Sequence, residues 1–317
     1  MIRVLATVVG AVAFVLGLAG AVARYLPISN EVVLVLAAAS PYLTVAAVVS
    51  MVAFALSRQP VPTIAAALLC IVMLAVLIPR YLGPEEPAAP SVPLRVVSAN
   101  LGMGRADPQA VVALADATAD VLVLQEMTPE AAAGLSAAGL DRGFPHRAID
   151  PKPMAAGIGV WSRHPIVAAT AVPGYQMPML STRIRVPEVR TETTVLAVHL
   201  AAPWVQPLRW FTDDIARLPE TLRAAADGPG AVIVAGDLNA TYDMRPFRRL
   251  LDAGYRDAAE QAGAGLTRSY PSRRWRPPVV GIDHVLVHNA VATSAYTVDV
   301  PGSDHRGLAT VIEVPVQ

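Results

Sequence analysis

The sequence predicts an α/β protein, a two-sheet α/β sandwich preceded by three transmembrane α-helices. Three long apolar runs fill the chain before Pro84, and the remainder has the composition of an ordinary globular protein. In that remainder, short β-type runs outnumber helical stretches, and long loops separate most of them. This arrangement fits two packed sheets with flanking helices better than a regularly alternating, doubly wound sheet.

The amino-terminal part of the chain carries almost no charge. Residues 4–23, 32–56 and 61–79 contain no charged side chain. About 20 predominantly apolar residues are enough to cross the hydrocarbon core of a bilayer. We therefore expect three spanning helices, because a helix satisfies its own backbone polar groups in lipid. Pro41 is expected to kink the second of them.

Two alternatives explain the apolar runs less well. Ala21-Val22-Ala23 looks like the small-residue cleavage site of a secretory signal. Two further apolar runs follow at once, however, and Arg3 is the only charge ahead of the first. A buried helical hairpin in a globular protein is disfavoured because almost nothing polar interrupts the first 80 residues.

The loop charges bear on membrane orientation. The positive-inside rule counts lysine and arginine residues in short loops. With three spans, Arg3 and Arg58 share one side, whereas Arg24 and Arg80 share the other. The free amino group adds to the first side, so we expect a cell-membrane protein with a cytoplasmic amino terminus and an extracytoplasmic carboxy-terminal domain. The single cysteine, Cys70, permits an oxidising compartment without requiring one.

A proline-rich stretch separates the apolar part from the globular part. Residues 83–93 contain four prolines, which predicts a semi-rigid extended linker between an anchor, residues 1–82, and a domain, residues 94–317. That domain holds 21 Lys and Arg against 22 Asp and Glu, a net charge of −1. It therefore lacks the overall positive charge expected of a domain that holds long nucleic acid, although a local groove can still be basic.

Apolar runs and turn residues predict the elements of this domain. Strands are expected at residues 94–99, 121–125, 157–162, 193–200, 231–235, 282–288 and 308–314. Helices are expected at residues 108–118 and 209–226, the second ended by Gly228-Pro229.

Polar residues stand at the ends of several of these strands. They are Asn100, Glu126, His199, Asp237, Asn239, Asp283, Asp304 and His305. Because strands deliver their end residues to a common edge of a sheet, we expect these side chains to converge on one cleft. The sequence therefore predicts a single polar site in the carboxy-terminal domain.

The residue types at these positions suit one kind of chemistry. Glu126, Asp237, Asn239 and Asp304 supply hard oxygen ligands, and no cysteine lies nearby. Such ligands suit Mg²⁺ or Mn²⁺, which bind a few carboxylates together with water and substrate phosphate. The histidines can transfer protons or donate hydrogen bonds to phosphate oxygens. Asp283 is expected to orient His305 and to favour its protonated form.

The same residues lie in motifs that resemble, in order, the signatures of the endonuclease/exonuclease/phosphatase superfamily, whose fold is DNase I-like. The motifs are Ser98-Ala99-Asn100, Leu124-Gln125-Glu126, residues 157–165, Val198-His199-Leu200, residues 236–239, Ile282-Asp283-His284 and Ser303-Asp304-His305. A short pattern such as Gly-Asp-Leu-Asn recurs by chance, but this ordered set spans nearly all of residues 94–317. The resemblance implies a metal-dependent hydrolase of phosphate esters.

The resemblance also implies a role for each site residue. Glu126 would be the principal ligand of Mg²⁺ or Mn²⁺, aided by Asn100 and Asp304. Metal and imidazoles together would neutralise the charge that grows on the phosphoryl oxygens during in-line attack by water.

The other residues would act on water and phosphate. Asp237 would orient or deprotonate the attacking water, and Asn239 would help to hold water or phosphate. His199 would donate to a non-bridging phosphate oxygen. His305, paired with Asp283, would transfer a proton or stabilise the transition state. The sequence leaves open whether Asp237 or His305 is the base.

Each of these residues, taken alone, also has an ordinary structural interpretation. Asp237 could cap a turn, and His199 could be a hydrogen-bonded core histidine. Glu126 could favour the start of the following helix through the helix dipole. Asp283 could be a solvated residue at a strand start. The joint pattern favours a single site over these separate interpretations.

An arginine-rich loop precedes Asp283. Its arginines are Arg268, Arg273, Arg274 and Arg276, interleaved with Tyr270 and Trp275. Guanidinium groups bind phosphate in a bidentate manner and stack on rings, so these residues are candidate substrate-binding groups. A solvated loop is an equally good interpretation. His284 is expected either to line the cleft or simply to pack.

We thus expect a membrane-anchored, divalent-metal-dependent phosphodiesterase, with a phosphate-ester substrate and a bilayer contact through residues 4–79. The substrate is either a lipid or envelope phosphoester or a nucleic acid, and no protein partner is inferred. The alternative is a catalytically inactive, membrane-bound binding or scaffold protein that keeps the fold. A transport function is disfavoured because the three apolar runs carry no internal charge.

Overall fold

The structure is a computed structural model that describes residues 1–84, 86–273 and 275–316. Its residues form two units by their contacts. One contains Met1–Tyr81 and Thr241–Arg248, and the other contains Leu82–Ala240 and Arg249–Gln317.

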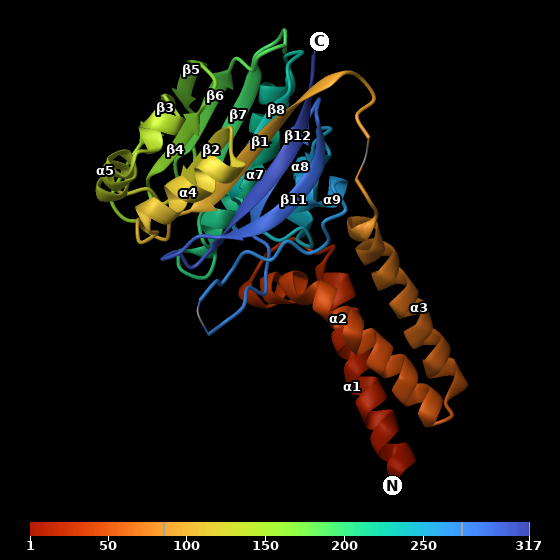
Figure 1. Ribbon diagram of the computed structural model, residues 1–317. Coiled ribbons are helices and arrows are strands. Elements are labelled where there is room, and N and C mark those ends of the chain that lie inside the picture. Colours follow the sequence, from red (N-terminus) through yellow and green to blue (C-terminus); the bar gives the residue numbers. More distant parts are fainter. Residues whose placement is uncertain (85, 274, 317) are drawn as a thin grey trace. The chain divides into compact units, whose positions relative to one another are not determined.

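The first unit contains the expected apolar helices, α1 (Ile2–Ala23), α2 (Glu31–Leu56) and α3 (Pro60–Leu77), and the 3-10 turn η1 (Ile78–Tyr81). All three helices are long and apolar enough to span a membrane, with mean hydropathies of 2.3, 2.3 and 2.8. The Asn30 side chain caps α2 by accepting a hydrogen bond from the Val33 backbone N–H. α2 contains Pro41 and bends along its length (Figure 1).

Small residues allow α1 and α2 to pack closely. A Cβ atom at Gly20 would lie 2.6 Å from the Leu43 side chain, and one at Gly17 would lie 3.3 Å from the Ala47 backbone nitrogen. Ser50 Oγ donates a 2.9 Å hydrogen bond to the Gly10 carbonyl. Close approach at small residues, with hydrogen bonds between helices, is typical of helix packing in lipid.

A buried ion cluster joins a segment from far along the chain to these helices. The Asp243 carboxylate accepts hydrogen bonds of 2.7 and 2.9 Å from Arg80 and forms an ion pair with Arg24. Arg248 donates 2.7 and 2.5 Å hydrogen bonds to the carbonyls of Asp243 and Arg24. Arg24 and Arg80 therefore share the Asp243 carboxylate. The sequence analysis treated both arginines only as loop charges, because no local pattern reveals this pairing.

We expect Asp243→Ala to lower the stability of the full chain. The substitution leaves Arg24 and Arg80 buried without their carboxylate, and breaking such a pair typically costs about 3–5 kcal/mol. Thermal unfolding in detergent measures the effect, with the exposed Asp252→Ala as the matched control. Equal unfolding temperatures for the two variants would contradict the expectation.

The second unit is built from two six-stranded sheets (Figure 1). The first sheet has the order β11 (Val291–Asp299), β12 (Arg306–Pro315), β1 (Ser91–Asn100), β2 (Val121–Gln125), β4 (Ile158–Ser162) and β3 (His146–Asp150). The second has the order β5 (Ile166–Ala171), β6 (Met179–Ile184), β7 (Thr193–His199), β8 (Val232–Asp237), β10 (Asp283–His288) and β9 (Arg256–Asp257).

Each sheet has one parallel pair at its centre. β1 and β2 are parallel, as are β7 and β8, whereas the other neighbouring strands are antiparallel. Helix α4 (Pro108–Thr118) lies between β1 and β2 in the chain, and α7 (Leu208–Ala226) lies between β7 and β8. This order follows from geometry, because parallel neighbours need a long crossover whereas antiparallel neighbours do not.

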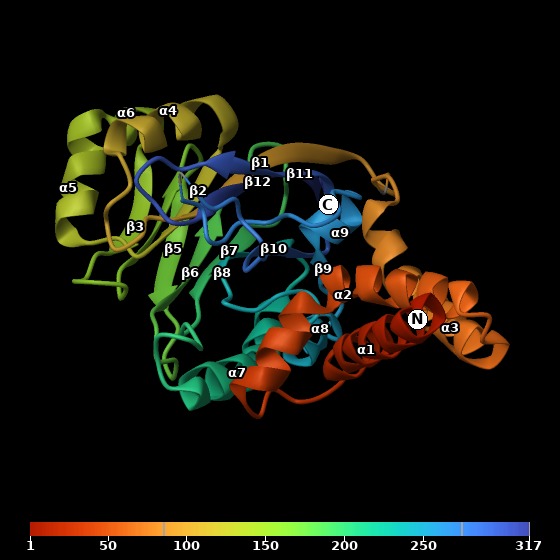
Figure 2. The ribbon, with the colours of Figure 1, turned by 90° about the horizontal axis from the view of Figure 1, so that it is seen from below.

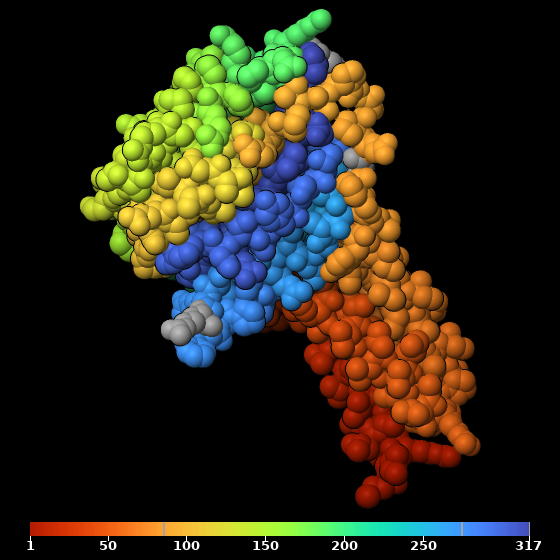
Figure 3. Space-filling view, viewed as in Figure 1, coloured from red at the N-terminus to blue at the C-terminus, as the bar shows by residue number. Residues whose placement is uncertain are grey.

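Alternating residues of the strands form two cores. Val96 and Val121 of the first sheet pack in one cluster with Val195 and Ile233 of the second. Val97 faces the opposite way, toward the inner side of α4. The helices α4, α5 (Pro129–Ala138) and α6 (Leu140–Gly143) cover the outer face of the first sheet (Figure 2). In Figure 3, α4 (yellow) and the strands β11 and β12 (blue) form one continuous surface.

The expected fold class, a two-sheet α/β sandwich preceded by three apolar helices, is confirmed. All seven expected strands are present, with ends shifted by up to three residues, and β1 begins at Ser91, inside the predicted linker. Strands β3, β5, β6, β9 and β11 and the helices α5, α6, α8 (Arg245–Leu251) and α9 (Ala258–Gln261) were not expected. Four of these five strands lie at sheet edges, where solvent-facing residues interrupt the apolar pattern.

Candidate active site

The predicted site residues lie at one edge of the two sheets. Asn100 ends β1 and Glu126 follows β2, while His199 ends β7 and Asp237 ends β8. The parallel strands of each pair therefore deliver their last residues to the same edge. Asp283 begins β10 and pairs with Asp237 across the antiparallel ladder, so an incoming strand contributes to the same place. Asp304 and His305 stand just before β12 of the first sheet, so three chain segments of each sheet meet there.

Asn100 connects the acidic groups of both sheets. Its side-chain amide donates hydrogen bonds of 3.1 Å to Glu126 Oε1 and 3.0 Å to Asp237 Oδ2. Its carbonyl Oδ1 accepts a 2.9 Å bond from the Gly102 backbone N–H. Because Asn100 is fully buried, these bonds fix the separation of the two carboxylates.

Glu126 is held in an uncommon backbone conformation. Its φ of 55° lies in the left-handed region, where a non-glycine residue is strained. Met103 donates its backbone N–H to Glu126 Oε2 at 2.6 Å, and the side chain stays 16% exposed. A Cβ atom at Gly157 would lie 1.8 Å from the Met127 carbonyl oxygen, so only glycine permits the close approach of β4. The local backbone thus turns the Glu126 carboxylate toward the cleft.

Asp304 completes a set of oxygen donors around the same loop. Its Oδ1 accepts a 3.2 Å hydrogen bond from Arg105, and a Cβ atom at Gly102 would lie 3.1 Å from that oxygen. Gly102 and its neighbour Met103 also donate to Asn100 and Glu126. The three residues predicted to bind metal thus surround one short loop. Their all-oxygen donor set fits Mg²⁺ or Mn²⁺.

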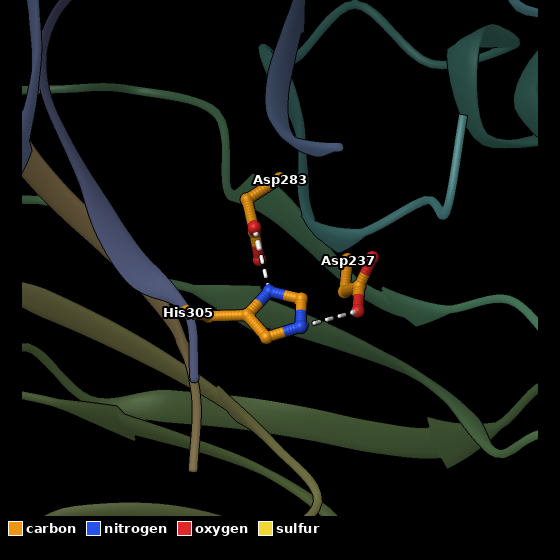
Figure 4. A group of neighbouring side chains, drawn as sticks. All are labelled: Asp237, Asp283 and His305. Atoms are coloured by element: carbon orange, nitrogen blue, oxygen red, sulfur yellow. Dashed lines mark hydrogen bonds and ion pairs between the residues drawn. The ribbon is translucent and has the colours of Figure 1, made fainter. Parts of the chain in front are cut away.

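A second group joins Asp237, Asp283 and His305 (Figure 4). His305 Nδ1 is 2.9 Å from Asp283 Oδ2, and His305 Nε2 is 3.8 Å from Asp237 Oδ2. The ligand atoms of all three lie within 4.8 Å of one another, a spacing that also suits a metal ion. The expected pairing of Asp283 with His305 is present, and the imidazole lies between two buried carboxylates.

This arrangement separates the protonation of Asp237 from that of His305. Burial and the neighbouring charge of Asp283 raise the pKa of Asp237 to about 7, although His305 opposes the rise. Burial alone would lower the pKa of His305, but the charges of Asp283 and Asp237 outweigh it and raise that pKa to about 10. Near neutral pH, His305 is therefore protonated, while Asp237 is close to its titration point.

His199 and Asn239 occupy the side of the cleft formed by the second sheet. His199 Nε2 lies 3.8 Å from Glu126 Oε1 and 3.9 Å from Asp237 Oδ2. Burial lowers the pKa of His199, although the Glu126 charge opposes this effect. The lowered pKa favours the neutral ring. Asn239, with φ 49°, donates its side-chain amide to the Leu200 carbonyl at 2.8 Å. This amide N–H therefore bonds the segment after β8 to the segment after β7. The sequence had suggested that Asn239 binds water or phosphate.

A pocket that is open to solvent collects these groups, with about 620 Å³ of empty space that includes part of the open solvent. The predicted residues that line it are Glu126, His199, Asp237, Asn239, Asp304 and His305. Asn100 and Asp283 are buried behind this lining, where they hold Glu126, Asp237 and His305. The pocket lining therefore contains both carboxylates and imidazoles.

The arginine loop contributes less than the sequence suggested. Arg273 lies 4.0 Å from Asp304 Oδ2, at the edge of ion-pair distance. Arg268 and Arg276 are exposed and are not among the described residues that line the pocket. Arg274 lies outside the residues that the structure describes. His284 is buried between Asp257 and the Ala240 carbonyl, at 2.7 and 3.0 Å, which is the packing role that the sequence left open.

The sequence analysis assigned no role at the site to three further residues. Tyr270 places its ring 4.8 Å from the His305 ring, and Arg105 pairs with Asp304. Ser303 Oγ donates to the Asn100 carbonyl at 2.7 Å and accepts the His305 backbone N–H at 3.0 Å. Ser303 was visible as part of the Ser-Asp-His motif and Tyr270 as a ring among the loop arginines, but nothing local distinguishes Arg105 from an ordinary loop residue.

Comparisons with known proteins agree with this fold. The crystal structure of an endonuclease/exonuclease/phosphatase from Bacteroides vulgatus is similar at a TM-score of 0.58 and 14% identity, covering 70% of this chain and 99% of that one. The 3′-5′ exonuclease NExo from Neisseria meningitidis is similar at 0.55 and 18%, covering 68% and 98%. A humanized D. rerio TDP2 is similar at 0.56 and 17%, covering 69% and 98%.

A family model gives the assignment. None of the curated proteins that were compared matches the chain. The model of the endonuclease/exonuclease/phosphatase family matches residues 97–305, which include all eight predicted catalytic and metal-binding residues. The chain therefore belongs to the endonuclease/exonuclease/phosphatase family.

Proposed function

We propose that this protein is a membrane-anchored, divalent-metal-dependent phosphodiesterase that hydrolyses its substrate by in-line attack of water. The observation that carries the proposal is the hydrogen bonding of Asn100 to both Glu126 and Asp237, with His305 3.8 Å from Asp237. One pocket thus joins oxygen ligands for a hard cation to groups that can move a proton.

Glu126, Asn100 and Asp304 are the residues that would hold Mg²⁺ or Mn²⁺. When bound there, such an ion neutralises charge on the phosphoryl oxygens. The remaining donors are provided by the chain itself. His199, neutral because of its burial, donates Nε2–H to a non-bridging phosphate oxygen.

Asp237 is the base in this proposal and His305 is not. A pKa of about 7 allows the Asp237 carboxylate to accept a proton from water near neutral pH. With a pKa of about 10, His305 already carries its proton and donates it, or a hydrogen bond, to the developing oxyanion. Asp283 keeps the imidazolium oriented through the 2.9 Å bond to Nδ1.

The three apolar helices support anchoring in the cell membrane. The excess of positive charge at the amino terminus favours an extracytoplasmic catalytic domain. A carboxy-terminal reporter that is active only outside the cytoplasm tests this orientation, and a silent external reporter beside an active cytoplasmic one would reverse it.

An inactive scaffold is the competing function, and the buried carboxylates argue against it. Asp237 and Asp283 face each other across the β8–β10 ladder and are both about 1% exposed. Two neighbouring buried carboxylates are costly to fold, so their presence favours a chemical use over a merely structural one.

Hydrolysis of bis(p-nitrophenyl) phosphate by the full chain tests the proposed function. We expect release of p-nitrophenolate that depends on Mg²⁺ or Mn²⁺. The full chain is needed because Asp243, within residues 94–317, has its ion partners at Arg24 and Arg80. Absence of turnover with every metal, in a folded protein, would favour the scaffold.

The activity should have a bell-shaped pH dependence. Turnover needs Asp237 deprotonated, so kcat should rise as pH increases through about 7. It also needs His305 protonated, so kcat should fall as pH passes about 10. Steady-state kinetics from pH 5 to 11 measure both limbs. His305→Gln should lose the alkaline limb, and a profile that keeps this limb in the variant would contradict the assignment.

A further inference from the structure

Three large apolar side chains that line the active-site pocket are exposed. Met103, Trp204 and Val205 line the pocket, and they expose 39%, 41% and 81% of their surface. We call these three residues the apolar lip. Met177 and Ala202 continue the apolar surface inward. A group of large apolar side chains exposed around a polar site is unfavourable in water and marks a surface that contacts something apolar.

Hydrogen bonds hold one side of the lip in place. Trp204 and Val205 stand at the tip of a turn in which the Ala202 carbonyl accepts the backbone N–H groups of Val205 and Gln206, at 3.2 and 2.9 Å. The Gln206 side chain closes the turn by accepting the Ala202 N–H at 2.9 Å. The turn is therefore ordered, and its exposed side chains do not result from a frayed loop.

Hydrogen bonds also connect the chain segments that carry the lip to the segments that carry the reacting groups. Leu200, just before the turn, donates its N–H to the Asp237 carbonyl at 3.0 Å and accepts the Asn239 amide at 2.8 Å. On the other side, Met103 donates to Glu126 at 2.6 Å. The backbone thus holds the apolar lip at a set separation from the carboxylates of the pocket floor.

The charges of the pocket do not suit a polyanion. Arg105 is the only guanidinium among the described residues that line the pocket, and it is bonded to Asp304. Glu126, Asp237 and Asp304 make the lining acidic. Proteins that hold a nucleic-acid strand need cations along its backbone. This pocket can accept one phosphate ester beside the apolar lip, while the exposed Arg273, 4.0 Å from Asp304, is not among the described residues that line it.

We propose that the substrate is an amphiphilic phosphodiester whose hydrocarbon part lies against Met103, Trp204 and Val205 while its phosphate lies among Glu126, His199, Asp237 and His305. The inference rests on the proposed phosphodiesterase function and names its substrate class. Helices α1 to α3 agree with it, since a bilayer is a source of such amphiphiles. Water attacks phosphorus and gives its proton to Asp237, while the bond from phosphorus to the leaving oxygen breaks and that oxygen keeps the electron pair and takes a proton from His305.

A series of p-nitrophenyl alkyl phosphates tests the proposal with the full chain in nanodiscs. The methyl, butyl and hexyl esters carry the same single charge and the same leaving group. A fully buried methylene contributes about fourfold to kcat/KM, and a half-buried one about twofold. We therefore expect kcat/KM to rise about thirtyfold from methyl to hexyl, which adds five methylenes.

A lip variant separates this contact from partitioning of the ester into the nanodisc. Trp204→Ala combined with Val205→Ser should reduce the hexyl-to-methyl ratio of kcat/KM to within about threefold of unity, since it removes most of the apolar contact. The matched control, Tyr296→Ala with Val167→Ser, changes exposed apolar residues of strands β11 and β5 and should keep the full ratio.

Three results would overturn the proposal. If kcat/KM did not depend on chain length while the methyl ester was still hydrolysed, the amphiphilic substrate would be refuted and the phosphodiesterase function would stand. A lip variant that retains the full ratio would show that partitioning produced it. A higher kcat/KM for the p-nitrophenyl ester of thymidine 5′-phosphate than for the hexyl ester would assign Trp204 to stacking on a base. Failure to hydrolyse any ester would instead refute the proposed function itself.

Discussion

Replacing Asp237 by asparagine should lower kcat by a factor of about 10² to 10⁴, the usual contribution of a positioned general base. The side chain keeps its shape but can no longer accept a proton from water. Its two oxygens accept hydrogen bonds from Asn100 and from the Asn239 backbone, so the amide retains one of the two bonds. The lost bond costs about 1 kcal/mol, which removal of a buried carboxylate facing Asp283 offsets.

Asp237→Asn should therefore be folded and inactive. Its kcat is measured with bis(p-nitrophenyl) phosphate and its unfolding temperature by circular dichroism. Asp214→Asn is the matched control, because Asp214 is a buried carboxylate on α7 that accepts the Gln176 N–H at 3.0 Å. Asp214 is not among the described residues lining the pocket, so the control should keep its activity. Comparable losses of kcat in the two variants would refute Asp237 as the base.

Glu126→Gln should cause the second large loss of activity, because it weakens binding of the metal ion. A carboxylate ligand contributes both charge and a donor atom, so we expect the affinity for Mn²⁺ to fall by at least about 10- to 100-fold, the effect of weaker outer-shell changes. The unmodified protein should also lose turnover, by about 10³-fold, when no metal is added, because a bound metal ion contributes several kcal/mol to transition-state stabilisation. Titration followed by electron paramagnetic resonance gives the affinity directly.

Two further variants test which group of residues binds the metal ion. Glu130→Gln changes an exposed carboxylate four residues along the chain and should bind Mn²⁺ as the unmodified protein does. Asp283→Asn should keep Mn²⁺ affinity while impairing His305. If Asp283→Asn lost the ion and Glu126→Gln kept it, the metal would belong to the Asp237, Asp283 and His305 group instead.

The sequence by itself determined features that depend on local patterns. Three uncharged runs predicted α1 to α3, since crossing a bilayer requires only length and apolar character. The buried strand β2 was found because its residues form a continuous apolar run, whereas the edge strand β3 was missed because it mixes polar and apolar residues. The edge strand β5 was not predicted although its composition is largely apolar. The ordered motifs also predicted which acidic and imidazole side chains stand at strand ends.

Only the tertiary structure decided how those side chains pair. Asn100 contacts Asp237, 137 residues later in the chain, because the register of two packed sheets brings their strand ends together. Arg80 meets Asp243, 163 residues away, because the segment 241–248 packs in one unit with the apolar helices. The different protonation of Asp237 and His305 depends on burial and on the distance to Asp283, which no residue type reveals. Local sequence sets periodicity and chemistry, whereas contacts between distant segments depend on how the completed sheets pack.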